Sequence, residues 1–377
     1  MKLRWVFVAV SVVLVVAVVA VAAGAVGGSS QGLYRLLGQL GQVLALVRSS
    51  YVEPVAAEKL ETGAMAGVVE AADPGGAYVP EQFRADIARV GARSLPPFGL
   101  VLGKRSSYPV VLQVIPNSPA ARAGILTGEL VERVGEEPVR ARPLWRAITL
   151  LDAAESQGKS ISVDVIDRRL AGKRTVTLAA APFARPKGAA SERDGIPVIV
   201  APLLDVAAGE EIASVLQPIS TKPGLVVDLR GVALGSPEGA AKVAAQLAGG
   251  EVQVVLARRD GKQQVMRQKG PERSWKLVVC IDNTTAGAAE LLAVALKTRG
   301  ATLVGMESFG DTAQRRPISG AGGEVWLASS WGLAPDGKAI LGDGLKPDET
   351  VRPRTGEDAI LARALELAGG QALKKAA

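Results

Sequence analysis

The chain has 377 residues, enough for two or three folded units, and its 44 Lys and Arg against 37 Asp and Glu give a net charge of +7. These charges are spread along the chain without a basic tract that could neutralise consecutive phosphates, so nucleic acid is excluded as an expected partner. Histidine is absent and Cys280 is the one cysteine, which excludes Ser-His-Asp and Cys-His catalysis, histidine-containing zinc sites and a disulfide framework. Any hydrolase of this composition would need a lysine base, and no metal or cofactor is expected.

Residues 5–28 form an apolar run interrupted only by Ser11. At about 1.5 Å per residue this run is long enough to cross ~30 Å of hydrocarbon. Lys2 and Arg4 precede it, and positive charge on the short flank keeps that end in the cytoplasm. The sequence therefore predicts a signal anchor at residues 1–30, with the rest of the chain on the far side of the membrane. A cleaved signal peptide, processed among the small residues at 22–25, is the alternative, and either one exports the chain.

Apolar residues recur at intervals of three and four between Tyr34 and Val47, which predicts an amphipathic helix. A second helix is predicted over residues 55–71, because the following Asp-Pro-Gly-Gly sequence disfavours continuation. A third is predicted over residues 80–93, ended by a Pro-Pro pair. Residues 31–95 are thus predicted to form an N-terminal helical module.

Residues 96–183 change to short apolar or alternating segments separated by Gly, Pro and Asn turns, which predicts a compact β-rich domain. The predicted strands are 98–102, 110–115, 130–134, 160–166 and 175–178. The polar residues 185–195 are interpreted as a linker.

Over residues 195–353 predicted strands alternate with predicted helices, which is typical of a layered α/β core with a largely parallel sheet. The predicted strands are 196–200, 224–229, 251–256, 276–281 and 301–305, and the predicted helices are 209–217, 236–248 and 286–298. Cys280 lies inside an apolar strand and is interpreted as a small buried hydrophobe. A C-terminal helix is predicted within residues 354–377.

Two motifs of the β-rich domain resemble those of PDZ domains. Phe98-Gly99-Leu100 is similar to the apolar-Gly-apolar loop whose backbone N–H groups bind a peptide's terminal carboxylate. Residues 117–131, which read NSPAARAGILTGELV, resemble the SPAxxAGxxxGDxI signature of bacterial PDZ domains, with Glu129 in place of the usual Asp. A generic β-turn-helix insert is the alternative. The resemblance implies binding of C-terminal peptides through Phe98, Gly99 and Leu100.

Further motifs on both sides of this domain resemble the carboxyl-terminal processing (tail-specific) serine peptidases, a family with a PDZ domain. They are Tyr51-Val52 with residues 73–78 (YV…LDPHSxY in the family), residues 226–230 (DLRxNxGG), residues 309–310 (TFGKG) and residues 331–348 (YxTPxGxxIxxxGxxPD). The resemblance implies a crotonase-like α/β core of layered sheet and helices with an inserted β-rich PDZ domain. It also implies a bacterial envelope protein, here single-pass in the inner membrane with its bulk on the periplasmic side, and envelope proteins as the source of the bound peptides.

The family's active site is a serine in an NxGSASASE segment at a helix N-terminus, deprotonated by the lysine of FGKG. The matching segment reads DNTTAGAAE at residues 282–290, and alignment on Glu290 puts the nucleophile position at Gly287. The lysine position falls on Asp311. The NPGG loop that supplies the oxyanion donors is Val-Ala-Leu-Gly at residues 232–235, with one glycine left. The resemblance therefore implies a peptidase homologue that has lost its catalytic dyad, a pseudoenzyme.

Two functions from different classes remain open on the sequence. The first is a non-catalytic adaptor or scaffold that binds C-terminal peptides, as a homo-oligomer or as the partner of an active paralogue. The second is an active endopeptidase in which Thr285 serves as a relocated nucleophile, with Lys297 or Lys338 as base. Two positions along a helix start rotate a hydroxyl by about 200°, away from the oxyanion donors. Thr284 and Thr285 are therefore interpreted as helix N-cap residues.

Overall fold

The computed structural model describes residues 30–167, 172–320, 322–353 and 356–369, arranged in two compact units that divide between Met65 and Ala66. The apolar run at residues 5–28, on which the predicted anchor depends, lies outside these residues. Within the described ranges, every helix is too short or too polar to cross a bilayer.

The first unit contains helix α2 (Ser30–Ser50) and the start of α3 (Ala57–Ala72). Both predicted helices are confirmed, and α2 extends beyond its predicted ends. Several apolar side chains of α2 are exposed, among them Leu37, Leu40 and Val43.

The second unit begins with the end of α3, followed by strand β1 (Ala77–Pro80), a 3-10 turn η1 (Glu81–Phe83) and helix α4 (Arg84–Gly91). The single helix predicted at 80–93 is therefore wrong in its first residues, where β1 ends and η1 lies, and α4 covers only residues 84–91. The β-rich domain follows as an antiparallel sheet of order β2-β3-β4-β6-β7, with β5 paired to β4. Its strands are β2 (Leu100–Arg105), β3 (Tyr108–Val114), β4 (Leu130–Val134), β5 (Glu137–Pro138), β6 (Ile161–Ile166) and β7 (Lys173–Leu178). The five predicted strands are all present, so the β-rich prediction is confirmed.

The β-rich domain also holds two helices, α5 (Pro119–Arg122) and α6 (Leu144–Ser156), and a 3-10 turn η2 (Pro97–Gly99). Ser118 caps α5, since its Oγ accepts from the Ala121 N–H at 3.2 Å and proline occupies the first helical position. Helix α6 is not among the predicted elements. It contributes Ala147 and Leu151 to a separate hydrophobic core that also contains Phe98.

A second sheet has the order β17-β14-β13-β10-β9-β8, parallel throughout except for the antiparallel β8–β9 pair. Its strands are β8 (Ala189–Arg193), β9 (Ile196–Val200), β10 (Gly224–Asp228), β13 (Lys276–Ile281), β14 (Thr302–Gly305) and β17 (Glu349–Thr350). The predicted parallel core is confirmed. The interpretation of 185–195 as a linker is wrong for residues 189–193, where an exposed polar segment pairs along the edge of β9.

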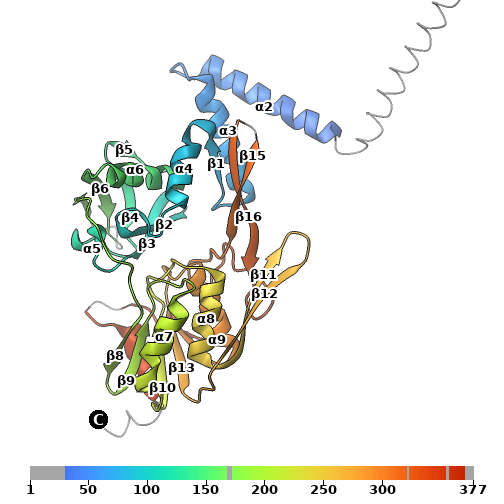
Figure 1. Cartoon of the computed structure of the whole chain (residues 1–377). Coiled ribbons are helices and arrows are strands. Elements are labelled where there is room, and N and C mark those ends of the chain that lie inside the picture. Colours follow the sequence, from blue (N-terminus) through green and yellow to red (C-terminus); the bar gives the residue numbers. More distant parts are fainter. Residues whose placement is uncertain (1–29, 168–171, 321, 354–355, 370–377) are drawn as a thin grey trace, which may run out of the picture. The chain divides into compact units, whose positions relative to one another are not determined.

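Helices cover both faces of this parallel sheet. Helices α7 (Ala208–Leu216), α8 (Pro237–Ala248) and α9 (Ala288–Thr298) pack on one face (Figure 1), and α10 (Ala359–Gly369) packs on the other. Alternate residues of each strand point to opposite faces. On β13, Val279 faces the core formed with the first three helices, whereas Val278 and Cys280 face α10. Cys280 is fully buried, which confirms its interpretation as a core residue.

A third, antiparallel sheet has the order β1-β16-β11-β12, with β15 paired to β16. It contains β11 (Gly250–Arg258), β12 (Gln263–Gly270), β15 (Gln314–Gly320) and β16 (Gly323–Gly332). The strand predicted at 251–256 is present but belongs to this sheet, not to the parallel one. A strand-helix alternation cannot distinguish these arrangements, because β11 follows a helix just as a parallel strand would.

Candidate functional site

The carboxyl ends of β10 and β13 lead into two loops that approach each other, residues 229–236 before α8 and residues 282–287 before α9. They line a cleft of about 1090 Å³ together with the segment 306–311 and strand β2 of the β-rich domain. Gly287 and Asp311, which are 24 residues apart in sequence, both line this cleft. The structure thus brings together the two positions that the sequence aligns with the family's serine and lysine.

Gly287 is the N-cap of α9 and has φ 57° and ψ −118°, a backbone conformation that residues with a side chain rarely adopt. A Cβ at this position would lie 3.1 Å from the carbonyl oxygen of Ala233 and 3.8 Å from that of Asp311. A side chain here would therefore point between the predicted oxyanion loop and the predicted lysine position. The turn that would present a nucleophile is formed, but it carries no side chain.

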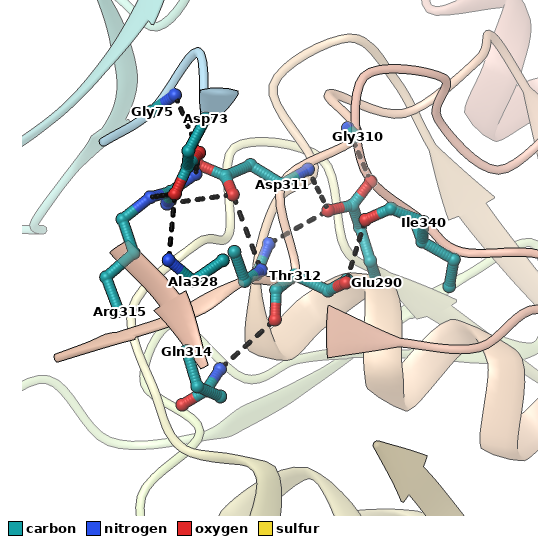
Figure 2. A network of polar contacts seen from close by, with 12 residues as sticks. Asp73, Gly75, Glu290, Gly310, Asp311, Thr312, Gln314, Arg315, Ala328 and Ile340 are labelled. Carbon is teal, nitrogen blue, oxygen red and sulfur yellow. Dashed lines mark hydrogen bonds and ion pairs between the residues drawn. The ribbon is translucent and has the colours of Figure 1, made fainter. Parts of the chain in front are cut away.

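Asp311, at the lysine position, is paired with Arg315 of β15 (Figure 2). Arg315 Nη1 lies 2.9 Å from Asp311 Oδ2, and on its other side Arg315 donates to both carboxylate oxygens of Asp73, at 2.9 and 3.0 Å. The guanidinium covers Gly75, where an added Cβ would lie 2.1 Å from Nη2 and would displace it. Asp311 therefore accepts a salt bridge from Arg315.

Asp73 has 5% of its side chain exposed and also accepts from the N–H groups of Gly75 and Ala328, at 3.0 and 2.9 Å. Burial raises the pKa of Asp73, but the hydrogen bonds and charge of Arg315 outweigh it and hold that pKa below its ordinary value. The Asp73-Arg315-Asp311 bridge joins the segment before β1 to Asp311, the predicted lysine position.

Glu290 lies in the first turn of α9 and is fully buried. Its carboxylate accepts from the N–H groups of Gly287, Gly310 and Asp311, at 3.0, 2.7 and 3.0 Å, and from the Ser308 hydroxyl (Figure 2). Burial raises the pKa of Glu290 to about 7 in spite of these donors. Glu290 therefore holds the nucleophile turn and the lysine position together.

The amides of the predicted oxyanion loop have a partner from the β-rich domain. The N–H groups of Ala233 and Leu234 both donate to Gln113 Oε1, at 3.0 and 2.9 Å, and Gln113 Nε2 donates to the Pro202 carbonyl oxygen. Gln113 is 1% exposed. Its oxygen thus occupies donors of the kind that stabilise an oxyanion in acyl transfer.

Gln113 lies outside the motifs that predict the site. The available signal was one polar residue inside the apolar β3 run at residues 110–115. Around it, Val110 and Leu112 of β3 pack against Ala286 and Phe309 beside the cleft. These contacts hold the β-rich domain on the loops of the site.

Thr285 is fully buried and does not line the cleft. Its Oγ1 donates to the Leu229 carbonyl oxygen at 2.9 Å and accepts from the Asp282 N–H at 3.0 Å. The Thr284 hydroxyl likewise donates to the Asp282 carboxylate and accepts from the Gly231 N–H. Because the N-cap of α9 is Gly287, the interpretation of the two threonines as N-cap residues is wrong; they join the two loops below the cleft.

The two candidate bases for Thr285 are both in ion pairs. Lys297 Nζ lies 2.6 Å from Asp348 and Lys338 Nζ lies 3.1 Å from Asp336. Neither lysine lines the cleft.

The loop Phe98-Gly99-Leu100 forms a tight turn with φ 52° at Phe98 and φ 76° at Gly99. The Gly99 and Leu100 N–H groups donate to the carbonyl oxygens of Pro96 and Pro97, and the Phe98 N–H donates to Glu155 Oε1 at 2.8 Å. All three amides expected to bind a peptide carboxylate therefore have acceptors within the chain. Across the described ranges, no group of three or more Asp, Glu or Cys side chains could hold a metal ion.

Residues 196–351 match the family model described as Peptidase family S41. Over 358 residues the chain is 25% identical to the carboxy-terminal-processing protease of Bartonella bacilliformis, covering 92% of this chain and 82% of that protein. It is 24% identical over 329 residues to the carboxy-terminal processing protease CtpB of Bacillus subtilis, covering 84% and 68%. Among solved structures, the photosystem II D1 C-terminal processing protease is similar in fold, with a TM-score of 0.66 and 20% identity, covering 85% of this chain and 89% of that one.

The pKa of Glu290 predicts a pH dependence of stability. The pKa is about 7 in the folded protein against an ordinary 4.5, so the folded state binds this proton more tightly than the unfolded state. The resulting stabilisation is complete below pH 4.5 and is lost as the pH rises through 7. The chain has no histidine to titrate in this window. In urea unfolding, the free energy of unfolding of Glu290→Gln is compared with that of the unaltered protein at each pH. This difference should shift by about 2 to 3 kcal/mol in favour of the variant between pH 5 and pH 8. A difference independent of pH would contradict this assignment.

The bridge predicts unequal costs for its members. Arg315→Met leaves Asp73 buried without its cation and should lower the free energy of unfolding by about 2 to 4 kcal/mol. Asp311→Ala should lower the free energy of unfolding by about 1 kcal/mol, because the ion pair between Arg315 and Asp73 is retained. Lys338→Ala, which removes an exposed pair, is the control and should change nothing measurable. Equal losses for Arg315→Met and Asp311→Ala in chemical unfolding would show that Asp73 does not depend on Arg315.

Proposed function

We propose that this chain, a homologue of the carboxy-terminal processing proteases with an S41-type segment at residues 196–351, is catalytically inactive and acts as a membrane-anchored adaptor or scaffold that binds C-terminal peptides. The observation that carries the proposal is the nucleophile turn at Gly287. Its backbone has a positive φ of 57°, which glycine adopts freely, and the position that would project a hydroxyl into the cleft has no side chain.

The other two requirements of acyl transfer support the same proposal. Such a reaction needs a base near the nucleophile and free donors for the oxyanion. Asp311, at the lysine position, is bound to Arg315. The Ala233 and Leu234 amides are bound to Gln113. Restoring one of these elements alone would leave the other two absent.

Peptide binding is supported by the edge of the β-rich sheet. Among the described strands β2 pairs only with β3, and its residues 101–105 line the cleft. An extended peptide could add to this free edge by backbone hydrogen bonds, with its terminus toward the Phe98-Gly99-Leu100 loop. The similarity of residues 98–100 and 117–131 to PDZ motifs supports the same mode.

The alternative endopeptidase with Thr285 as nucleophile is disfavoured by the position of its hydroxyl. Thr285 is fully buried and both of its hydrogen bonds serve the loops beneath the cleft. Association with a second copy or with an active paralogue remains compatible with an adaptor, and co-purification from membranes would identify such a partner.

Binding without cleavage is the expected behaviour. The full-length protein should bind an unstructured peptide with an apolar, free carboxyl terminus, and mass spectrometry should recover that peptide intact after long incubation. Amidating the terminus should abolish most of the binding. Gly287→Ser combined with Asp311→Lys should give trace turnover at most, because Gln113 still occupies the oxyanion donors and the new lysine faces Arg315. Cleavage by the unaltered protein that is lost in Thr285→Ala would sink the proposal.

The membrane topology is proposed from the apolar run at residues 5–28 and the positive charges before it. Protease added to intact spheroplasts should degrade residues 30–377 and leave cytoplasmic proteins whole. Degradation only after the inner membrane is broken would refute this topology.

A further inference from the structure

The loop expected to bind a peptide carboxylate already holds a carboxylate. Glu155, in the last turn of α6, accepts the Phe98 N–H at 2.8 Å through Oε1. The neighbouring Gly99 and Leu100 amides bond to backbone oxygens of their own turn. Phe98 is therefore the one amide of this loop whose partner is a side chain from another element.

The same carboxylate is held from its other side by a cation. Arg93, which follows α4, forms an ion pair with Glu155 Oε2 and places Nη1 2.9 Å from Asp152 Oδ1. Glu155 has 11% of its side chain exposed and Asp152 has none. Together, the Phe98 amide and the Arg93 guanidinium form a two-sided receptor for one carboxylate, of the charge-assisted kind that binds such groups well.

A pocket of about 590 Å³ adjoins this contact, lined by Arg93, Leu95, Glu155 and Phe183 among others. Gly158, which also lines it, has φ 66° in the turn that ends α6. The pocket provides space beside the carboxylate for a ligand side chain. The flexible side chain of Glu155 can turn away without unfolding α6, and Asp152 would keep Arg93 in place.

We propose that Glu155 is an internal competitor that sets the affinity of this loop for terminal carboxylates. A peptide's carboxylate binds to the Phe98 N–H and Arg93 only when Glu155 has left them. This rests on the proposed peptide-binding function. A site that is free for only a fraction of the time has its apparent affinity reduced by that fraction, so removal of the competitor strengthens binding with no new contact to the peptide.

The test uses the full-length protein and a fluorescent peptide with an apolar carboxyl terminus, in free-acid and amidated forms. Glu155→Ala should lower the dissociation constant of the free acid at least tenfold and leave that of the amide unchanged. Glu155→Gln keeps an acceptor for the Phe98 N–H but loses the charge facing Arg93. Its dissociation constant for the free acid should lie between those of the unaltered protein and Glu155→Ala. Glu137→Ala is the matched control, because it removes a carboxylate paired with Arg146 in the same domain without touching the loop.

An unchanged or weaker affinity of Glu155→Ala, while the unaltered protein binds the free acid, would overturn the competitor role and leave the proposed function standing. If neither protein binds a peptide, hydrogen exchange at the Phe98 amide shows whether the contact with Glu155 exists. If exchange at Phe98 becomes faster in Glu155→Ala but no protein binds either peptide, the contact is real, the peptide-binding function fails, and the competitor role fails with it.

Discussion

The side chain of Gln113 is the contact on which the arrangement of the site depends. Its oxygen accepts two partly buried backbone N–H groups from the loop after β10, and its nitrogen donates to the buried Pro202 carbonyl, so one carboxamide satisfies three backbone groups. Each such group would cost roughly 1 to 3 kcal/mol if left without a partner. In a peptidase of this architecture the two amides would have to remain free for the developing oxyanion. Here they stabilise the packing of the β-rich domain on the core.

Other polar groups around the cleft are also satisfied by side chains of the same chain. Asp311, at the predicted lysine position, is held by the Asp73-Arg315-Asp311 bridge, and the turn at Gly287 is held by Glu290. In the β-rich domain, Glu155 accepts the Phe98 N–H of the loop predicted to bind a peptide carboxylate. Polar groups that a peptidase would use on its substrate are satisfied by the chain's own side chains. The donors at the predicted nucleophile, base and oxyanion positions therefore all have partners within the chain.

Local patterns in the sequence were sufficient to predict most of the helices and strands. Strands β9 and β13 are short apolar runs and match their predicted ranges, and Ser236 caps α8 through the Gly239 N–H as its position suggests. Helix α6 carries a three- and four-residue apolar period in Leu144, Ile148 and Leu151, but it lies among short apolar segments that predict strands. The contacts that decide the chemistry were out of reach. Gln113 and Ala233 are 120 residues apart and Arg315 and Asp73 are 242 apart, and such pairings follow from tertiary packing, which no local pattern encodes.

The most direct test of this account is hydrogen exchange at the Ala233 and Leu234 amides, measured in the unaltered protein and in Gln113→Ala, with the Val226 and Val227 amides of the parallel sheet as an internal reference. The account predicts slow exchange at both loop amides in the unaltered protein. In Gln113→Ala it predicts fast exchange at these two amides, while the reference amides remain slow. Rapid exchange at Ala233 and Leu234 in the unaltered protein would mean that the donors are free, and would contradict the claim that the chain itself fills its oxyanion site.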